Sequence, residues 1–177
     1  MNLTGQAKFT DKRDGNVYLT MSVSGVIWMA ENLRYKANSG AFYFDNDSNN
    51  NNGYGILYEW KTAKNSCPGG WHLPSGNEFQ ALINYFDHRV TSQKIDTDSS
   101  SFVIQLGGMQ DYEGIFSEMD ESAYYWTSTE YDVTNAEYFS YILIDDKPVI
   151  DISRKADIAD IPGTEKANKY SVRCLKD

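Results

Sequence analysis

The sequence predicts an α+β fold, in which the helices are grouped early in the chain and many short strands follow them. Three observations lead to this class. Residues 17–23 alternate apolar and polar side chains with a period of two, as a half-buried strand does. Helical spacing follows over residues 57–64 and 76–87. Later in the chain, short apolar runs are separated by turn residues, so strands and loops are expected to its end.

The N-terminal part begins with a predicted hairpin. Polar residues 11–16 form a turn before the strand over residues 17–23. A second turn at Ser24 and Gly25 leads into another strand that begins over residues 26–29. Residues 45–52 have the sequence DNDSNNNN, which predicts a polar low-complexity loop without any core-forming residue.

The helix over residues 76–87 has a clear start signal. Residues 67–74 (CPGGWHLP) form a rigid, turn-rich connector before it. Ser75 and Glu78 then make a capping box, in which the Ser oxygen accepts from the Glu78 amide while Glu78 reaches back. Four apolar residues follow at helical spacing, namely Phe79, Leu82, Ile83 and Phe86.

Four strands are predicted in the second half, over residues 102–104, 125–129, 138–144 and 149–152. Gly107 and Gly108 end the first, and residues 109–123 are expected to form a loop with several acidic side chains. A turn at residues 145–148 makes a hairpin of the last two strands. A polar segment over residues 153–168 precedes a final strand. One face of that strand carries Tyr170, Val172 and Cys174.

Charge excludes several classes of function. The chain has 16 Lys and Arg against 25 Asp and Glu, a formal net charge of −9, so we expect no nucleic-acid binding and no peripheral helix on anionic lipid. No apolar run reaches the roughly 18 residues of a transmembrane segment. The start at Met1 carries no signal peptide, which fits a cytosolic protein or an exported one whose signal has been removed.

Cys67 and Cys174 are the two cysteines, and they allow three interpretations. We favour a disulfide that joins the connector to the last strand, which also favours export. Two buried free thiols are the second possibility. The third is a catalytic Cys67 thiolate assisted by His72, although no helix terminus or basic cluster is evident to lower the pKa of the thiol.

A metal site is not expected. His72 and His88 match no zinc-ligand spacing, and we expect a hydrogen-bonded ring for His72 and a place near a helix C-terminus for His88. Asp45, Asp47 and Asn49 alternate as calcium ligands do, but the rest of the EF-hand template fails. A looser calcium site there or in the later acidic loop is the alternative to a solvated acidic surface. The acids of that loop are Asp111, Glu113, Glu118, Asp120 and Glu121.

No catalytic constellation stands out. Glu31 and Glu130 are the natural pair for glycoside hydrolysis, but each is more easily explained as a buried acid that accepts backbone hydrogen bonds. The sequence contains no phosphate-binding loop, nucleophile elbow or dinucleotide fingerprint. The chain is therefore expected not to be an enzyme and to need no cofactor.

Aromatic residues make up 14% of the chain, and 13 of them are Tyr. The four tryptophans, Trp28, Trp60, Trp71 and Trp126, are expected in the core. Four other aromatic residues lie in or beside predicted loops, where their faces could stack on a ligand: Tyr112, Phe116, Tyr124 and Tyr131. With acceptors such as Asp111 and Glu113 nearby, these faces would suit a sugar ring or a protein interface.

Five segments in this order resemble the Fibrobacter succinogenes major paralogous domain, a family of secreted or lipid-anchored bacterial surface proteins. They are WMAENL (28–33), YGILY (54–58), CPGGWHLPS (67–75), YWTSTE (125–130) and SVRC (171–174). The resemblance covers residues 9–177 of a single domain over residues 1–177 and leaves residues 1–8 as a flexible leader. Many members carry a further cysteine pair near residues 42–52, which this chain lacks, and no lipobox is present.

The family is distantly similar to C-type lectin-like folds, including the formylglycine-generating enzymes. This similarity implies twisted antiparallel sheets with two helices in the N-terminal half and long irregular loops that present the binding surface. The formylglycine-generating relatives use a redox-active cysteine pair near the C-terminus, for which this chain has no spare cysteines. The resemblance therefore also argues against catalysis.

These observations predict a non-enzymatic, exported surface domain, lipid-anchored in its full-length form. It is expected to bind a glycan or a cell-surface protein through loop residues. The residues expected to contact the ligand are Asp111, Tyr112, Glu113, Tyr124 and Tyr131. The alternative is a structural module of a fimbria-like or envelope complex with an aromatic protein interface. A glycan hydrolase is a third hypothesis, which a pair of acids facing each other across a cleft would support.

Overall fold

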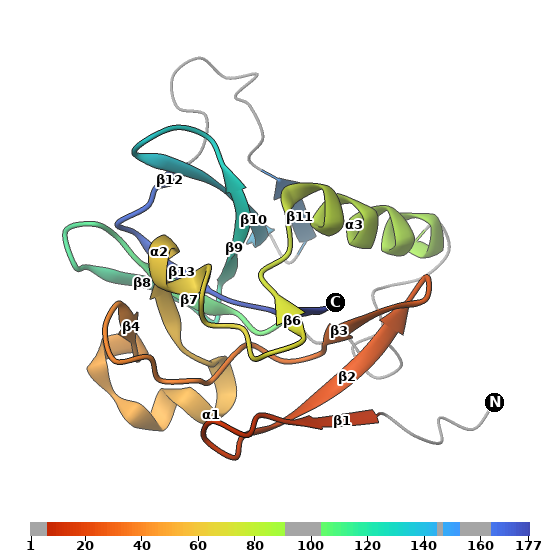
Figure 1. The fold of residues 1–177 in the computed structure, drawn as a ribbon. Coiled ribbons are helices and arrows are strands. Elements are labelled where there is room, and N and C mark those ends of the chain that lie inside the picture. The colour runs from red at the N-terminus through yellow and green to blue at the C-terminus, as the bar shows by residue number, and fades with distance from the viewer. Residues whose placement is uncertain (1–6, 91–103, 145–146, 153–163) are drawn as a thin grey trace.

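The computed structural model describes residues 7–90, 104–144, 147–152 and 164–177, and it has the α+β character that the sequence predicts. Two sheets and one long helix dominate it (Figure 1). The helix lies beside the strands over residues 122–152, and the hairpin over residues 107–119 lies on the opposite side of the molecule (Figure 1).

The smaller sheet has five strands in the order β1-β2-β3-β14-β6. These strands are β1 (Ala7–Thr10), β2 (Val17–Val23), β3 (Val26–Met29), β14 (Leu175–Lys176) and β6 (Trp71–His72). The predicted β2–β3 hairpin is confirmed, with Val23 opposite Val26. Its buried face differs from the simple alternation, because Tyr18 is fully buried while Val17 is 45% exposed. The Tyr18 hydroxyl accepts from the Arg34 amide at 2.9 Å, so its polar end is satisfied inside.

The larger sheet has nine strands, with the main path β11-β10-β9-β7-β13-β5-β4. Its strands are β4 (Ala41–Phe42), β5 (Leu57–Glu59), β7 (Gly107–Gln110), β8 (Phe116–Met119), β9 (Ser122–Glu130), β10 (Asn135–Ile144), β11 (Lys147–Ile152), β12 (Thr164–Glu165) and β13 (Lys169–Ser171). The pairing of β10 with β11 confirms the predicted second hairpin. The expectation of purely antiparallel sheets is wrong, because β7 and β13 both run parallel to β9.

The described residues contain three α-helices, α1 (Asn51–Tyr54), α2 (Trp60–Ala63) and α3 (Gly76–Val90). Two 3-10 turns precede them, η1 (Phe44–Asn46) and η2 (Ser48–Asn50). Helix α3 confirms the helix predicted for residues 76–87. The predicted capping box is also confirmed, since Ser75 N donates to Glu78 Oε2 at 2.7 Å. No helix in the described part of the chain has the length and apolarity needed to cross a membrane.

Three predicted elements differ from the structure. In place of the loop expected over residues 45–52, η2 forms a 3-10 turn that the Asp47 side chain caps by accepting from Asn49 N, and α1 begins at Asn51. Residues 57–59 are a strand, because they pair with both β4 and β13. The expected loop over 109–123 is mostly strand, because β7 pairs with β8. The predicted strand over residues 102–104 lies largely outside the described residues, and Ile104 is not in a strand.

The C-terminal segment joins the two sheets. The predicted last strand is broken, since β13 ends at Ser171 and β14 begins at Leu175. Between them, Val172 O accepts from Leu33 N and Cys174 O accepts from Met29 N. The segment is buried on both sides, since Ser171 and Arg173 are buried as well as Tyr170, Val172 and Cys174.

The core fills the space between the sheets and beneath α3. Phe79 of α3 is 5.3 Å from Trp28 and 5.2 Å from Phe139, measured between ring centroids. All four tryptophans are buried, as the sequence predicts. Trp126 also donates through Nε1 to Tyr58 O at 2.6 Å, which satisfies its polar group inside the core.

Candidate functional site

Two neighbouring hairpin turns of the larger sheet carry most of the exposed large apolar side chains. We call residues 111–115 the β7–β8 tip and residues 131–134 the β9–β10 tip. Six large apolar residues are exposed in the described part of the chain. Four of them lie on the two tips: Tyr112 (57% exposed), Ile115 (59%), Tyr131 (43%) and Val133 (91%). Grouped exposure of this kind is typical of a contact surface.

The β7–β8 tip is held by Asp111. Its carboxylate accepts from Ile115 N at 2.8 Å, and its carbonyl accepts from Gly114 N at 3.1 Å. Gly114 has φ +92°, a conformation that favours glycine. Because the polar groups of the turn bond to one another, the Tyr112 and Ile115 side chains are left outside.

In the β9–β10 tip, the Asp132 carboxylate likewise accepts hydrogen bonds from amides of the turn. One carboxylate oxygen accepts from Thr134 N and from Asn135 N, each at 2.7 Å. Hydrogen bonds from the Asn135 side chain and from the Thr134 and Asn135 amides lower the pKa of Asp132 to about 2. The tip therefore carries a fixed negative charge beside Tyr131.

The segment before β13 brings the tips together. Lys166 Nζ donates to Val133 O at 2.9 Å and also to Asp132 O and Glu130 Oε1. Lys169 Nζ donates to Asp111 O at 3.1 Å. The charge of Glu113, a hydrogen bond to it and the charge of Glu165 raise the pKa of the Tyr112 hydroxyl.

The structure thus brings together four of the five residues expected to contact a ligand, with Asp111, Tyr112 and Glu113 on one tip and Tyr131 on the other. Tyr124 lies elsewhere. It stands within β9 rather than beside a loop and is only 8% exposed. Its hydroxyl donates to Glu118 Oε2 at 2.6 Å, and its ring stacks on Tyr170 at 5.2 Å. The expectation that Tyr124 presents an open face is therefore wrong.

Sequence reasoning missed Ile115, Val133 and the two lysines. A single apolar residue between polar ones gives no signal of exposure, because the same pattern also marks core residues of a strand. The lysines gave no signal either, since Lys166 lies in a segment expected only to be polar and Lys169 lies at the start of the predicted last strand. Phe116 of β8 is also not an open platform, because its ring lies 5.2 Å from Phe44.

The two carboxylates considered for hydrolysis have separate partners. Glu31 Oε2 accepts from Leu19 N at 2.7 Å, as predicted, and Oε1 pairs with Arg34 at 3.2 Å, but the side chain is 27% exposed rather than buried. Glu130 is exposed and pairs with Lys166, so the expectation that it is buried is wrong.

Metal-ligating side chains do not converge in the described residues, where no three His, Cys, Asp or Glu side chains are grouped for an ion. Of the acids considered for calcium, Asp47 caps a 3-10 turn, Glu118 binds the Tyr124 hydroxyl and Asp120 binds the Tyr54 hydroxyl. The His72 ring is hydrogen-bonded, as expected, with Nε2 3.1 Å from Glu78 Oε1 and Nδ1 2.7 Å from Asp177 Oδ1. His88 falls in the last turn of α3.

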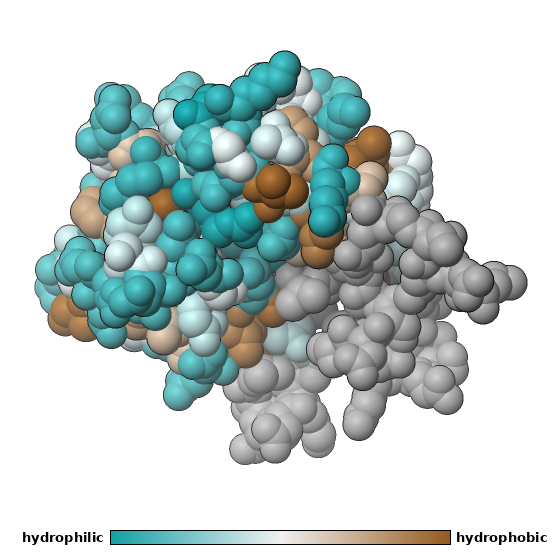
Figure 2. Space-filling model, turned by 90° about the horizontal axis from the view of Figure 1, so that it is seen from below, coloured by the Kyte–Doolittle hydropathy of each residue, from teal (hydrophilic) through white to brown (hydrophobic). Residues whose placement is uncertain are grey.

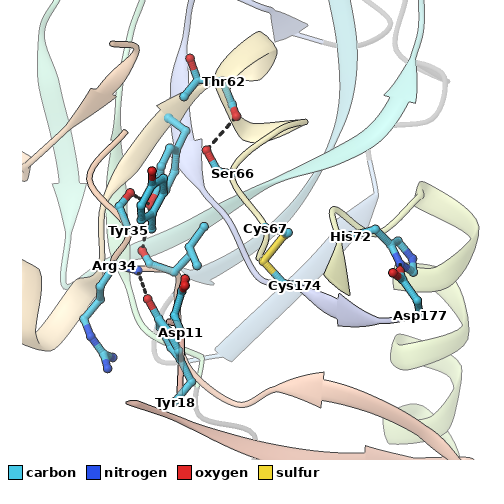
Figure 3. Close-up of a disulfide and its surroundings, with 12 residues drawn as sticks. Asp11, Tyr18, Arg34, Tyr35, Thr62, Ser66, Cys67, His72, Cys174 and Asp177 are labelled. Carbon is cyan, nitrogen blue, oxygen red and sulfur yellow. Dashed lines mark hydrogen bonds and ion pairs between the residues drawn. A yellow bond between two sulfur atoms is a disulfide. The ribbon is translucent and has the colours of Figure 1, made fainter. Parts of the chain in front are cut away.

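Cys67 and Cys174 form the predicted disulfide, with an S–S distance of 2.07 Å (Figure 3). The connector at Cys67 is also tied to the N-terminal turn, because Arg13 Nη2 donates to Ser66 O at 2.8 Å. The two alternatives of free thiols and a His72-assisted thiolate do not apply to the bonded form.

The described residues on the face seen from below are mostly hydrophilic, with hydrophobic residues in small groups (Figure 2).

Comparison with known protein families gives a match over most of the chain: the Fibrobacter succinogenes major domain matches residues 21–176. No curated protein and no solved structure matches the sequence.

Proposed function

Because the chain belongs to the Fibrobacter succinogenes major domain family, we propose that it is a non-enzymatic domain of the bacterial surface that binds a glycan through its two hairpin tips. One observation carries this proposal: Tyr112 and Tyr131 are exposed on neighbouring tips beside carboxylates. An exposed Tyr ring offers an apolar face to the C–H side of a sugar, and carboxylates accept from its hydroxyls.

Export is part of the proposal. The Cys67–Cys174 disulfide supports it, because disulfides persist in oxidising compartments outside the cytosol. The resemblance to secreted and lipid-anchored proteins supports an anchor in the full-length form. We further propose a C-type lectin-like arrangement, which is supported by one long helix beside a twisted sheet and by a contact surface built from turns.

A protein interface is the second candidate, and it rests on a different observation. Ile115 and Val133 are aliphatic and are the two most exposed large apolar side chains of the described residues. Branched aliphatic groups contribute to protein contacts through area alone, whereas they offer little to a sugar ring. This alternative predicts an envelope or fimbria-like assembly in which the tips contact another subunit.

A glycan array on the purified domain, run with calcium and again with chelator, tests the proposal. We expect binding in both conditions, with about a tenfold or greater loss of affinity for Tyr112→Ala and for Tyr131→Ala, equivalent to at least about 1.4 kcal/mol. Tyr112→Phe separates the ring from its hydroxyl. Val26→Ala is the matched control, because Val26 is exposed on the other sheet.

Each other outcome has a defined meaning. Binding that disappears in chelator would replace aromatic stacking with a calcium-dependent site. Binding that survives both tyrosine substitutions would move the ligand away from the tips. No binding on either array would favour the protein interface, which Ile115→Ser and Val133→Ser should then weaken in a cross-linking or pull-down experiment with the envelope fraction.

A further inference from the structure

Lys166 is anchored under the β9–β10 tip. Its amine contacts three oxygen atoms, and all three belong to that tip or to the last residue of β9: Glu130 Oε1, Asp132 O and Val133 O. The side chain is only 17% exposed. Its amine also lies 4.7 Å from the centroid of the Trp60 ring, and Trp60 is fixed by donation from Nε1 to Thr127 O at 2.8 Å. Its positive charge is compensated by the Glu130 carboxylate and by two main-chain oxygens of the tip.

Lys169 occupies the corresponding place under the β7–β8 tip. It is buried on β13, directly opposite Gln110 of β7, so the two side chains lie on the same face of the sheet. Lys169 Nζ donates to Asp111 O at 3.1 Å, and Gln110 Nε2 donates to Gly114 O at 2.9 Å. The Lys169 amine and the Gln110 side-chain amide therefore both donate hydrogen bonds to main-chain oxygens of this tip.

The segment that links the two lysines is itself fixed. Lys166 N donates to Thr134 O at 2.9 Å, and Lys166 O accepts from Trp60 N at 3.2 Å. Asn168 N donates to Glu165 O at 2.9 Å, which closes the turn before β13. Since β13 is paired with β5 and β7, the main chain that carries Lys169 is fixed to the sheet.

We propose that Lys166 and Lys169 are positioning residues that set the two tips at a fixed separation, so that a single ligand contacts both tips at once. This inference rests on the proposed function for its ligand, but the positioning itself can be tested without one. A surface held in its binding geometry loses less conformational entropy when it binds. The ligand should accordingly have two separate groups for the Tyr112 and Tyr131 faces.

Hydrogen exchange of the intact domain tests the positioning. We expect Lys166→Met to speed exchange of the Thr134 and Asn135 amides by about tenfold or more, because an opening cost of about 1.4 kcal/mol is then lost. Lys169→Met should do the same for the Gly114 and Ile115 amides. In both variants the Trp126 amide in the middle of β9 should keep its wild-type exchange, which separates local release from general destabilisation.

Two further variants make the result specific. Lys64→Met is the matched control, because the Lys64 amine lies 4.5 Å from the centroid of the same Trp60 ring. Among the hydrogen bonds of the described residues it has none to either tip. Lys166→Arg keeps a donor and should restore slow exchange at the β9–β10 tip. Unchanged exchange at both tips in the two Met variants would overturn the proposal, as would equal acceleration in Lys64→Met.

Binding on the same glycan array then distinguishes the two proposals. Two results together support a single ligand that contacts both tips. The Met variants release the tips and weaken glycan binding about tenfold. The double variant Tyr112→Ala/Tyr131→Ala loses less binding free energy than the sum of the losses of the two single variants. The idea of a shared ligand would be refuted if the losses of binding free energy in the two tyrosine variants were fully additive and the Met variants bound as the wild type does. If exchange at the tips is faster in the Met variants but the wild-type protein binds no glycan, the proposed function is rejected and the positioning role is kept.

Discussion

Cys67 and Cys174 are 107 positions apart in the sequence, and their disulfide fastens the connector before β6 to the segment that passes from the larger sheet to the smaller one. The bond therefore lies where the two sheets meet. Cys174 is fully buried, and its carbonyl oxygen accepts from Met29 N of β3. The same short segment thus carries both a covalent link and a main-chain link between the sheets.

Removal of this disulfide should destabilise the domain strongly. In the chain-entropy account, closing a loop of this length stabilises the folded state by about 4 to 5 kcal/mol. We expect the double variant Cys67→Ala/Cys174→Ala to melt well below the wild type in a thermal unfolding experiment. Reductant should lower the melting temperature of the wild type and leave the double variant unchanged. Two titratable thiols in the native wild-type protein would contradict the bond.

The ring of His72 makes stability depend on pH. Burial acts to lower the pKa of His72, but hydrogen bonds to Asp177 and Glu78 and the charges of these two groups raise it above the ordinary value of 6.5. For Glu78, burial acts to raise the pKa, but hydrogen bonds from Ser75 and His72 lower it below 4.5. Figure 3 shows His72 and Asp177 side by side.

The sign of the effect follows from these directions. A raised His72 pKa stabilises the fold fully below pH 6.5, and this contribution is lost as the pH rises through the folded-state pKa. The lowered Glu78 pKa stabilises above pH 4.5, and that contribution is lost as the pH falls through its folded-state value. The stability difference between wild type and His72→Gln should therefore be largest between pH 4.5 and 6.5.

Two measurements check this pH dependence. Melting curves of the wild type and His72→Gln across pH should diverge most within that interval. An NMR titration of the His72 ring should give a pKa that falls towards the ordinary value in Asp177→Asn. A stability difference that grows steadily above pH 7 would contradict the assignment, as would a His72 pKa that is insensitive to Asp177→Asn.

Gly108 is required by the backbone of the β7–β8 hairpin. It has φ +59°, and a Cβ built there would lie 2.3 Å from Ser117 O and 2.6 Å from Met119 N. Neither backbone atom can withdraw without breaking the pairing of β7 with β8. We expect Gly108→Ala to destabilise the domain by at least about 2 kcal/mol in chemical denaturation.

Gly69→Ala is the matched control for this substitution. Gly69 has no heavy atom within 4 Å of the position of an added Cβ. Its substitution should change the free energy of unfolding by less than about 0.5 kcal/mol. Equal effects of the two substitutions would show that the hairpin adapts to a side chain at position 108.

The capping box of α3 should have a measurable but smaller effect. Ser75 Oγ accepts from Glu78 N at 3.3 Å, and Glu78 Oε2 accepts from Ser75 N at 2.7 Å. We expect Ser75→Ala to reduce the free energy of unfolding by about 1 kcal/mol, since one amide in the first turn loses its acceptor. Gln80→Ala on the surface of the same helix is the control and should be close to neutral. A neutral Ser75→Ala would refute the contribution of the cap.

The sequence by itself determined those features that depend on neighbouring residues. The β2–β3 hairpin, helix α3 with its cap, and β9 to β11 follow from alternation, helical spacing and turn residues within windows of about ten residues. The buried tryptophans and the acidic charge also required no contact distant in sequence. Tyr112, Tyr131, Asp111 and Glu113 could be proposed as surface residues because turn chemistry keeps tips in solvent.

Only the tertiary structure decided how these pieces meet. Residues 57–59 have helical spacing but form β5, because pairing with β4 and β13 satisfies their backbone groups and outweighs the weak helix preference. Tyr124 was expected beside a loop but is buried within β9, because this strand begins at Ser122 and pairs with β10. The link between the two tips depends on Lys166 and Lys169. Their amines donate to main-chain oxygens of residues more than 30 positions away in the sequence. Such contacts leave no period in the sequence, so only the folded chain shows that residues 166–169 bond to both tips.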